Sequence, residues 1–183
     1  MGERRASCNV RGVSTRRQVM AGAGAVLGSL AFGSGGRANA QETMEHAPSS
    51  SAHQVLTSLH QEVSLPASPM RVYKILLDSS EFAAFSGMPA KIDPIAGGAF
   101  TMFSGRIAGR NVELVPGRRI VQAWRPSSWG PGVYSIVRFE LNARGPETLV
   151  VLDHTGFPAG EFDHLFPGWK MRYWDPLAKY LQA

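Results

Sequence analysis

The feature that most constrains the fold is a run of short strand-like segments that ends in one long amphipathic helix. Five such segments are separated by turns rich in glycine and proline, and they cover residues 99–103, 107–115, 119–124, 133–141 and 148–154. Short strands at even spacing are typical of a mainly antiparallel sheet. We therefore predict a single curved sheet with one apolar face.

Residues 162–181 are predicted to form the helix that covers this sheet. Apolar side chains recur there at helical spacing, at Leu165, Phe166, Trp169, Tyr173, Leu177 and Tyr180. Pro167 is expected to delay the start of the helix and Pro176 to bend its middle. Because a bent helix need not pack solidly on a curved sheet, a cavity between the two is expected. The fold class is therefore α+β, a curved antiparallel sheet wrapped around a long C-terminal helix.

The segment before these strands predicts one strand and two short helices. Residues 55–63 alternate well enough for a strand. Ser68 is a good N-cap and Pro69 suits the first helical position, so a helix is expected to run from there to Asp78. Residues 80–85 indicate a second short helix, which Gly87 ends.

Residues 1–40 have the three parts of a signal peptide: a basic region, an apolar region and a small-residue cleavage site. Arg16 and Arg17 lie in a segment similar to the twin-arginine export motif. The apolar run over 19–32 is shorter than a stable membrane span, which needs about 20 residues. An A-x-A sequence ends at Ala40, so cleavage is expected before Gln41. We expect recognition by the twin-arginine export machinery and a periplasmic or otherwise exported protein.

Two alternatives to this interpretation stay open. The usual lysine after the apolar pair of the twin-arginine motif is missing, so the general secretory route is an alternative. Translation from Met20 or Met44 would leave a cytoplasmic protein. The polar residues 41–53 indicate a flexible linker, which leaves 54–183 as a single domain.

The charge distribution argues against a nucleic-acid partner. The whole chain has 19 basic and 14 acidic residues, but residues 1–40 hold six of the basic residues and one of the acidic ones. The remainder has 13 of each, and nucleic-acid binding needs clustered cations. The single cysteine, Cys8, precedes the apolar run, so neither a lipid anchor nor thiol chemistry is expected in the exported protein.

The polar residues indicate neither a metal site nor a catalytic one. His46 and His53 lie in or beside the linker, and His60 is alone on its strand. Asp153 and His154 are neighbours on a strand and point to opposite faces of the sheet. Glu113 is expected to pair with Arg110, Arg125 or another cation across the sheet. Because no G-x-S-x-G motif is present either, we expect no catalytic residue, no metal and no cofactor.

Several short motifs, in order, carry a family resemblance over about 55–181. They are residues 65–73, the turn at Gly97-Gly98, the stretch 105–117 with Asn111 and Glu113, the strand 120–125, and the residues 154–158 and 168–177. The chain thus resembles the SRPBCC (START-like, helix-grip) superfamily, and within it the C-terminal domain of the heat-shock protein 90 ATPase activator. The resemblance implies a helix-grip fold. The activator's N-terminal domain has no counterpart here, and an export signal is foreign to a cytosolic cochaperone.

Aromatic residues provide the best functional lead, although core packing is the alternative for each. Those expected to line the cavity and hold a small apolar or aromatic ligand are Phe85, Phe100, Trp124, Trp129, Tyr134, Trp169 and Tyr173. Trp129 is expected at the rim, and Trp124 and Tyr134 are expected to supply polar contacts to the ligand.

Two other functions stay open at this stage. One is a protein-interaction role like that of the family's namesake, with an unidentified protein partner. The other is an enzyme that acts on an aromatic or polyketide-like substrate, with Glu113, Asp153 or His154 as the candidate catalytic residues.

Overall fold

One seven-stranded antiparallel sheet is the largest element of the domain. The computed structural model describes residues 56–183, and its strands lie in the order β1-β7-β6-β5-β4-β3-β2. Their bounds are β1 Ser58–Leu65, β2 Lys91–Ile92, β3 Ala99–Met102, β4 Ile107–Val115, β5 Arg119–Pro126, β6 Ser135–Arg144 and β7 Glu147–Thr155. β1, the first strand, pairs with β7, the last strand, so all seven strands belong to one antiparallel sheet, as predicted.

The strand bounds differ from the predicted ones in a few places. The first strand was expected over 55–63, but β1 begins at Ser58 and runs on to Leu65; residue 55 lies outside the described part. β6 begins at Ser135 instead of Val133, because 130–133 close a turn in which the Val133 N–H donates to the Gly130 carbonyl. β2 was not expected at all, since two residues are too few to show an alternating pattern.

Two short helices follow β1, as predicted. α1 (Pro69–Leu77) has Ser68 as its N-cap, and the Ser68 Oγ accepts a hydrogen bond from the Arg71 N–H at 3.3 Å. α2 (Ser79–Ser86) has Asp78 as its N-cap, and the Asp78 carboxylate accepts hydrogen bonds from the N–H groups of Ser80 and Glu81 at 2.9 and 2.8 Å. It ends at Gly87, in the left-handed conformation (φ 70°) that glycine adopts without strain.

The C-terminal helix consists of three consecutive segments, α3 (Phe162–Trp169), the π-helical turn η1 (Lys170–Trp174) and α4 (Asp175–Tyr180). The predicted delay at Pro167 is wrong: α3 begins at Phe162 and contains Pro167, whose missing N–H costs only the bond to the exposed Asp163. The irregularity expected at Pro176 lies just before it. There the Asp175 N–H donates to the Lys170 carbonyl, five residues back, as in a π-helix.

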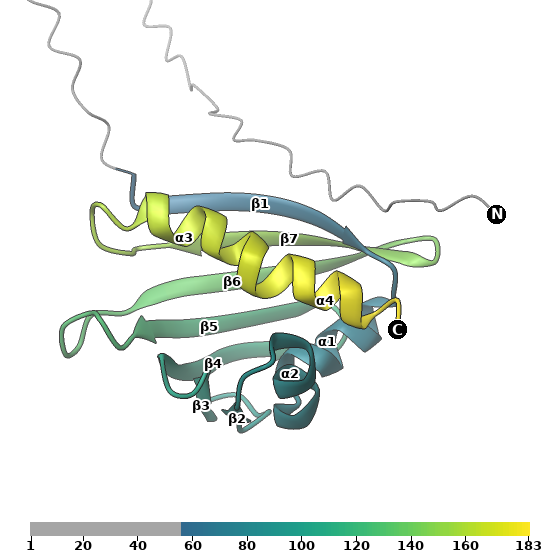
Figure 1. The fold of residues 1–183 in the computed structure, drawn as a ribbon, viewed down its shortest axis with the longest axis horizontal. Coiled ribbons are helices and arrows are strands. Elements are labelled where there is room, and N and C mark those ends of the chain that lie inside the picture. The colour runs from purple at the N-terminus through teal and green to yellow at the C-terminus, as the bar shows by residue number, and fades with distance from the viewer. Residues whose placement is uncertain (1–55) are drawn as a thin grey trace, which may run out of the picture. The chain divides into compact units, whose positions relative to one another are not determined.

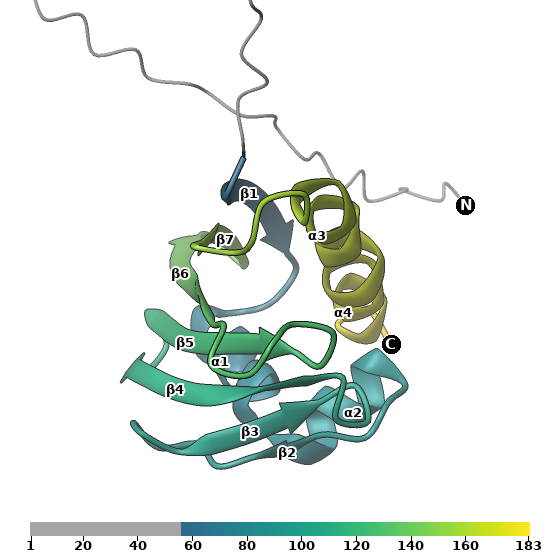
Figure 2. The same ribbon diagram turned by 90° about the vertical axis from the view of Figure 1, so that its left-hand side faces the viewer.

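The sheet curves around this helix, which confirms the predicted fold class. Figure 1 shows α3 and α4 running diagonally across the sheet, and Figure 2 shows them along the face toward which the sheet curls. Alternate residues of each strand point toward the helix; in β1 these are Leu59, Gln61, Val63 and Leu65. The helix supplies Trp169, Tyr173, Trp174 and Leu177 to the same core.

The export predictions concern a part of the chain that the structure does not describe. The signal peptide over 1–40, the cleavage before Gln41 and the linker over 41–53 all lie outside residues 56–183. Within 56–183, none of the helices is both long and apolar enough to cross a membrane.

Candidate ligand pocket

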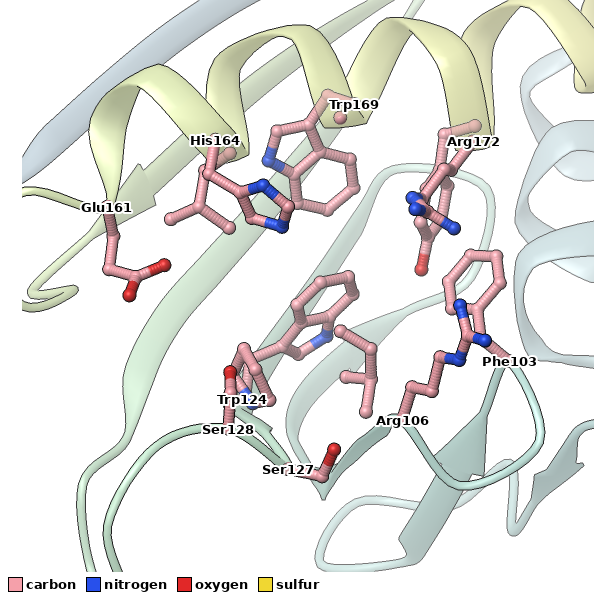
Figure 3. Close-up of a pocket in the computed structure, with 14 residues that line it drawn as sticks. Phe103, Arg106, Trp124, Ser127, Ser128, Glu161, His164, Trp169 and Arg172 are labelled. Atoms are coloured by element: carbon pink, nitrogen blue, oxygen red, sulfur yellow. The ribbon is translucent and has the colours of Figure 1, made fainter.

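A pocket of about 380 Å³ lies between the C-terminal helix and the strands β4 and β5. Seven of its lining side chains are mainly apolar: Phe103, Ile107, Trp124, Pro126, Leu165, Trp169 and Tyr173. Six are polar or charged: Arg106, Ser127, Ser128, Glu161, His164 and Arg172. Figure 3 shows the helix and the sheet contributing to opposite walls. The cavity expected between these two elements is therefore present, and its volume is within the range of small-molecule sites.

Four aromatic rings form a continuous wall of the pocket. The rings of Trp124 and Trp169 stack with centroids 4.9 Å apart and an interplanar angle of 26°. Tyr173 lies 4.6 Å from Trp169, and Phe103 lies 5.4 Å from Tyr173 in an edge-to-face arrangement. Since Trp124 comes from β5 and the stacked Trp169 from α3, this contact also holds the helix on the sheet.

His154, on β7, fixes the position of Trp169 from behind the wall. The Trp169 indole N–H donates to His154 Nδ1 at 3.3 Å, and His154 Nε2 lies 2.7 Å from Ser135 Oγ. Because Nδ1 accepts, the proton of the neutral ring is on Nε2 and is donated to Ser135. Burial lowers the pKa of His154 to about 4, so the ring is neutral near pH 7. The sequence patterns did not indicate this pairing of His154 with Trp169.

A second buried chain of hydrogen bonds fixes Trp124. Its indole N–H donates to Gln122 Oε1 at 3.0 Å, and Gln122 donates in turn to Asn111 Oδ1 at 2.9 Å. Asn111 donates to the Asp93 carbonyl at 2.8 Å, which ties the loop before β3 to β4. The single N–H of Trp124 is thus already bonded within the protein. Trp124 therefore has no free N–H for the polar contact expected of it, because Gln122 takes that donor, and it offers a ligand its ring surface.

Three of the seven predicted ligand-binding residues, Trp124, Trp169 and Tyr173, come together in the pocket wall. Two others are buried away from it. The Phe85 ring packs 4.7 Å from the Phe82 ring and 6.1 Å from the Tyr173 ring. Phe100 lies over Gly109, where an added Cβ would overlap its ring. Both therefore serve packing in this structure.

The remaining two predicted residues are placed differently from the expectation. Trp129 was expected at the rim, but only 6% of it is exposed and the pocket receives Ser127 and Ser128 from its loop instead. Tyr134 is half exposed and lines a shallow hollow together with Ala123. Ala123 and Trp124 are neighbours on β5, so this hollow is on the sheet face opposite the pocket.

Two irregular backbone segments deliver pocket residues that the sequence patterns did not indicate. In the turn after β3, Phe103 and Ser104 adopt positive φ angles of 54° and 58°, and Arg106 follows. The turn η1 contributes Arg172 beside Tyr173. Helical spacing from Trp169 could have indicated Arg172, three residues later. No sequence signal marks Phe103 and Ser104, because left-handed backbone is unusual for such residues.

Charged side chains on the opposite face of the sheet are paired with one another. Asp153 accepts from His60 at 2.7 Å and from Arg138 at 2.9 Å, so His60 is not alone. Burial by itself would raise the pKa of Asp153, but these two hydrogen bonds outweigh it and lower the pKa. The predicted opposite directions of Asp153 and His154 are thereby confirmed.

The pairing continues toward β4. Arg119 bridges Glu140 at 2.8 Å and Glu113 at 3.2 Å. Glu113 therefore pairs with a cation across the sheet, as expected, and that cation is Arg119. In residues 56–183 no three His, Cys, Asp or Glu side chains are grouped so that they could hold a metal ion.

Comparison with solved structures places this fold in a known class. A crystal structure of an HSP90 activator from Plasmodium falciparum superposes with a TM-score of 0.66 and 24% identity, over 69% of this chain and 97% of that one. A protein from Chromobacterium violaceum superposes with a TM-score of 0.58 and 26% identity, over 69% and 98%. The fold is the helix-grip, SRPBCC-type fold.

Sequence comparison then identifies the family. The model of the family "Activator of Hsp90 ATPase homolog 1-like protein" matches residues 66–182, and the chain belongs to this family. An activator of 90 kDa heat shock protein ATPase homolog from Dictyostelium discoideum is 36% identical over 111 residues, 60% of this chain and 29% of that protein. A Homo sapiens homolog is 30% identical over 110 residues, 60% of this chain and 32% of that protein. The chain thus spans about a third of these relatives.

Proposed function

We propose that this domain binds a small apolar or aromatic molecule in the pocket between the sheet and the C-terminal helix. The observation that carries the proposal is the aromatic wall of Phe103, Trp124, Trp169 and Tyr173 around a space of about 380 Å³. The indole N–H groups of Trp124 and Trp169 are bonded to Gln122 and His154. What the wall offers a ligand is therefore mainly ring surface.

The proposed role is binding without catalysis. His154, which accepts the Trp169 indole N–H, has both nitrogens engaged and is fully buried behind Trp169. General-base catalysis needs a side chain within hydrogen-bond reach of the substrate. Glu113 and Asp153 lie on the opposite face of the sheet, in ion pairs with Arg119 and Arg138.

A variant at Gly168 tests the binding proposal. Gly168 lines the pocket on α3, and a Cβ added there would meet no atom within 4 Å. Gly168→Leu should therefore fill the pocket and leave the fold intact, with a small gain in helix propensity. The neutral fluorescent probe N-phenyl-1-naphthylamine should bind the wild type and lose at least about tenfold in affinity for the variant, or about 1.4 kcal/mol.

Met171→Leu is the matched control, because Met171 is on the same helix but 63% exposed. It should bind the probe like the wild type. Equal affinity of all three proteins would show that the probe binds elsewhere, and absence of binding to the wild type would contradict the proposal.

The proposed place of action is outside the cytoplasm. This part of the proposal rests on Arg16, Arg17 and the A-x-A sequence that ends at Ala40. Cell fractionation with N-terminal sequencing of the mature protein tests it. A mature start at Gln41 in the periplasmic fraction is expected, and a cytoplasmic protein that starts at Met20 or Met44 would overturn it.

A protein-interaction role is the second candidate, and the sequence comparison favours it. The relatives from Dictyostelium discoideum and Homo sapiens carry the name of activators of the 90 kDa heat shock protein ATPase. The two candidates differ in one measurable property, the ATPase rate of a purified 90 kDa heat shock protein. A domain of the interaction type would raise that rate, whereas a ligand-binding domain would not.

A further inference from the structure

Two arginine side chains at the pocket have no side-chain partner among residues 56–183. In the described part of the chain, neither Arg106 nor Arg172 makes an ion pair or a side-chain hydrogen bond. Both line the pocket, and Figure 3 shows their guanidinium groups on the same side, with Glu161 on the other. By contrast, Arg71, Arg119 and Arg138 are all paired with carboxylates.

Each of these arginines comes with an aromatic wall residue from an irregular piece of backbone. The left-handed turn at Phe103 and Ser104 directs the buried Phe103 ring into the wall and leads into Arg106. The π-helical turn holds Arg172 next to Tyr173. Left-handed non-glycine residues and π-helical turns are both unfavourable locally and recur at functional sites. Here both occur at one end of one pocket, and the two rings they supply are 5.4 Å apart.

The charges of the pocket define what this end can bind. Two arginines and Glu161 leave a net charge of one positive unit when His164 is neutral, which a single negative charge on the ligand would balance. A guanidinium group donates parallel hydrogen bonds to a planar carboxylate, and such charge-assisted bonds are stronger than neutral ones. An apolar wall next to the arginines reduces the competition from water.

We infer that the pocket takes an aromatic carboxylic acid, whose ring lies against Trp124 and Trp169 and whose carboxylate binds Arg106 and Arg172. This inference rests on the proposed ligand-binding function and adds the chemical class of the ligand. It does not require any reaction of the ligand.

The experiment compares 2-naphthoate with its neutral isostere 2-naphthamide by isothermal titration calorimetry. The full-length mature protein should bind the acid about ten times more tightly than the amide. Arg106→Gln and Arg172→Gln should each weaken acid binding by about five- to tenfold and weaken amide binding less, because the neutral amide makes no charge-assisted bond. Arg118→Gln is the matched control, since Arg118 is exposed on the turn between β4 and β5 and does not line the pocket.

The outcomes separate the two proposals. Equal binding of the acid and the amide, or an acid preference that survives both pocket substitutions, would overturn the carboxylate inference while the binding function stands. Acid binding that is lost equally in Arg118→Gln would overturn it as well, because the effect would come from general charge. If neither compound bound the wild type, both the inference and the binding function would fail. Circular dichroism of each variant confirms that the fold is retained.

Discussion

The two faces of the sheet differ in whether their charged residues form ion pairs. On the outer face, Asp153 and Glu140 connect His60, Arg138 and Arg119 in one series of hydrogen bonds and ion pairs. At the pocket on the inner face, Arg106, Arg172 and Glu161 have no such partner among the residues described. Paired surface charges satisfy one another and contribute little to stability. Unpaired charges beside an aromatic wall are available to a ligand, and this is why we place the function on the inner face.

A second contrast lies within the pocket itself. Its two indoles donate buried hydrogen bonds to His154 and Gln122, whereas its two arginines are exposed and make no ion pair within residues 56–183. Substitutions in the wall should therefore reduce the stability of the fold, whereas substitutions of the charged groups should reduce the affinity for a ligand. Substitutions in the wall and at the charges should thus differ in their effect on stability.

Removal of the central wall residue should cost most. Trp169→Ala empties the space between Trp124, Tyr173 and Trp174 and leaves His154 Nδ1 without its donor. Substitution of a buried tryptophan by alanine costs about 3–5 kcal/mol. Urea unfolding followed by circular dichroism measures this loss. A loss below about 1 kcal/mol would be close to that of a surface substitution, which reaches about 0.5 kcal/mol. It would mean that the aromatic wall is not what holds the helix on the sheet.

Acidification should weaken the fold through His154. Its pKa is about 4 in the folded protein and about 6.5 in an unfolded chain, so the unfolded state binds the proton first. Stability is complete above pH 6.5 and falls as the pH decreases toward 4, by a total of about 3 kcal/mol. The lowered pKa of Asp153 adds a further loss only below its ordinary value near 4.

His154→Gln separates these contributions. The variant has no group that titrates between pH 4 and 6.5 at this position, so its free energy of unfolding should change less over that range than that of the wild type. An equal pH dependence in the two proteins would assign the acid sensitivity to other groups.

The ion pairs of the outer face should contribute a small, salt-dependent stability. Arg138→Gln removes the bond to Asp153 at 2.9 Å, and exposed pairs of this kind are worth about 0–1 kcal/mol. The loss should shrink further in 1 M NaCl, where the Debye length is about 3 Å. A loss of the same size in high salt would point to packing instead of charge.

The smallest effect on stability is expected at the pocket charges. Arg172→Gln should change the free energy of unfolding by less than about 0.5 kcal/mol, because the side chain is exposed and makes no ion pair in the described structure. A clear loss of stability would contradict the division between wall and charges. A clear gain would strengthen it, since an unbalanced positive charge would then have been removed.

The local elements were predictable because their signals are local. Ser68, Asp78 and Gly87 mark helix ends through bonds to their near neighbours in the chain, which the sequence displays directly. β2 has no such signal because it has only two residues and forms by pairing with β3. The effect of Pro167 was mispredicted, because a proline inside a helix is tolerated when the residue whose carbonyl it leaves unbonded, here Asp163, is exposed.

Residue order alone was enough for the fold class, and it selected three of the aromatic residues that form the wall. Alternation along strands and spacing along a helix are properties of that order, so the amino-acid sequence is sufficient to recognise them. The tertiary contacts were needed to establish that Phe85, Phe100 and Trp129 serve packing, and that Arg106 and Arg172 flank one pocket. The physical reason is that a pocket is made where segments far apart in the chain meet. Which atoms remain unpaired there depends on every neighbour at once.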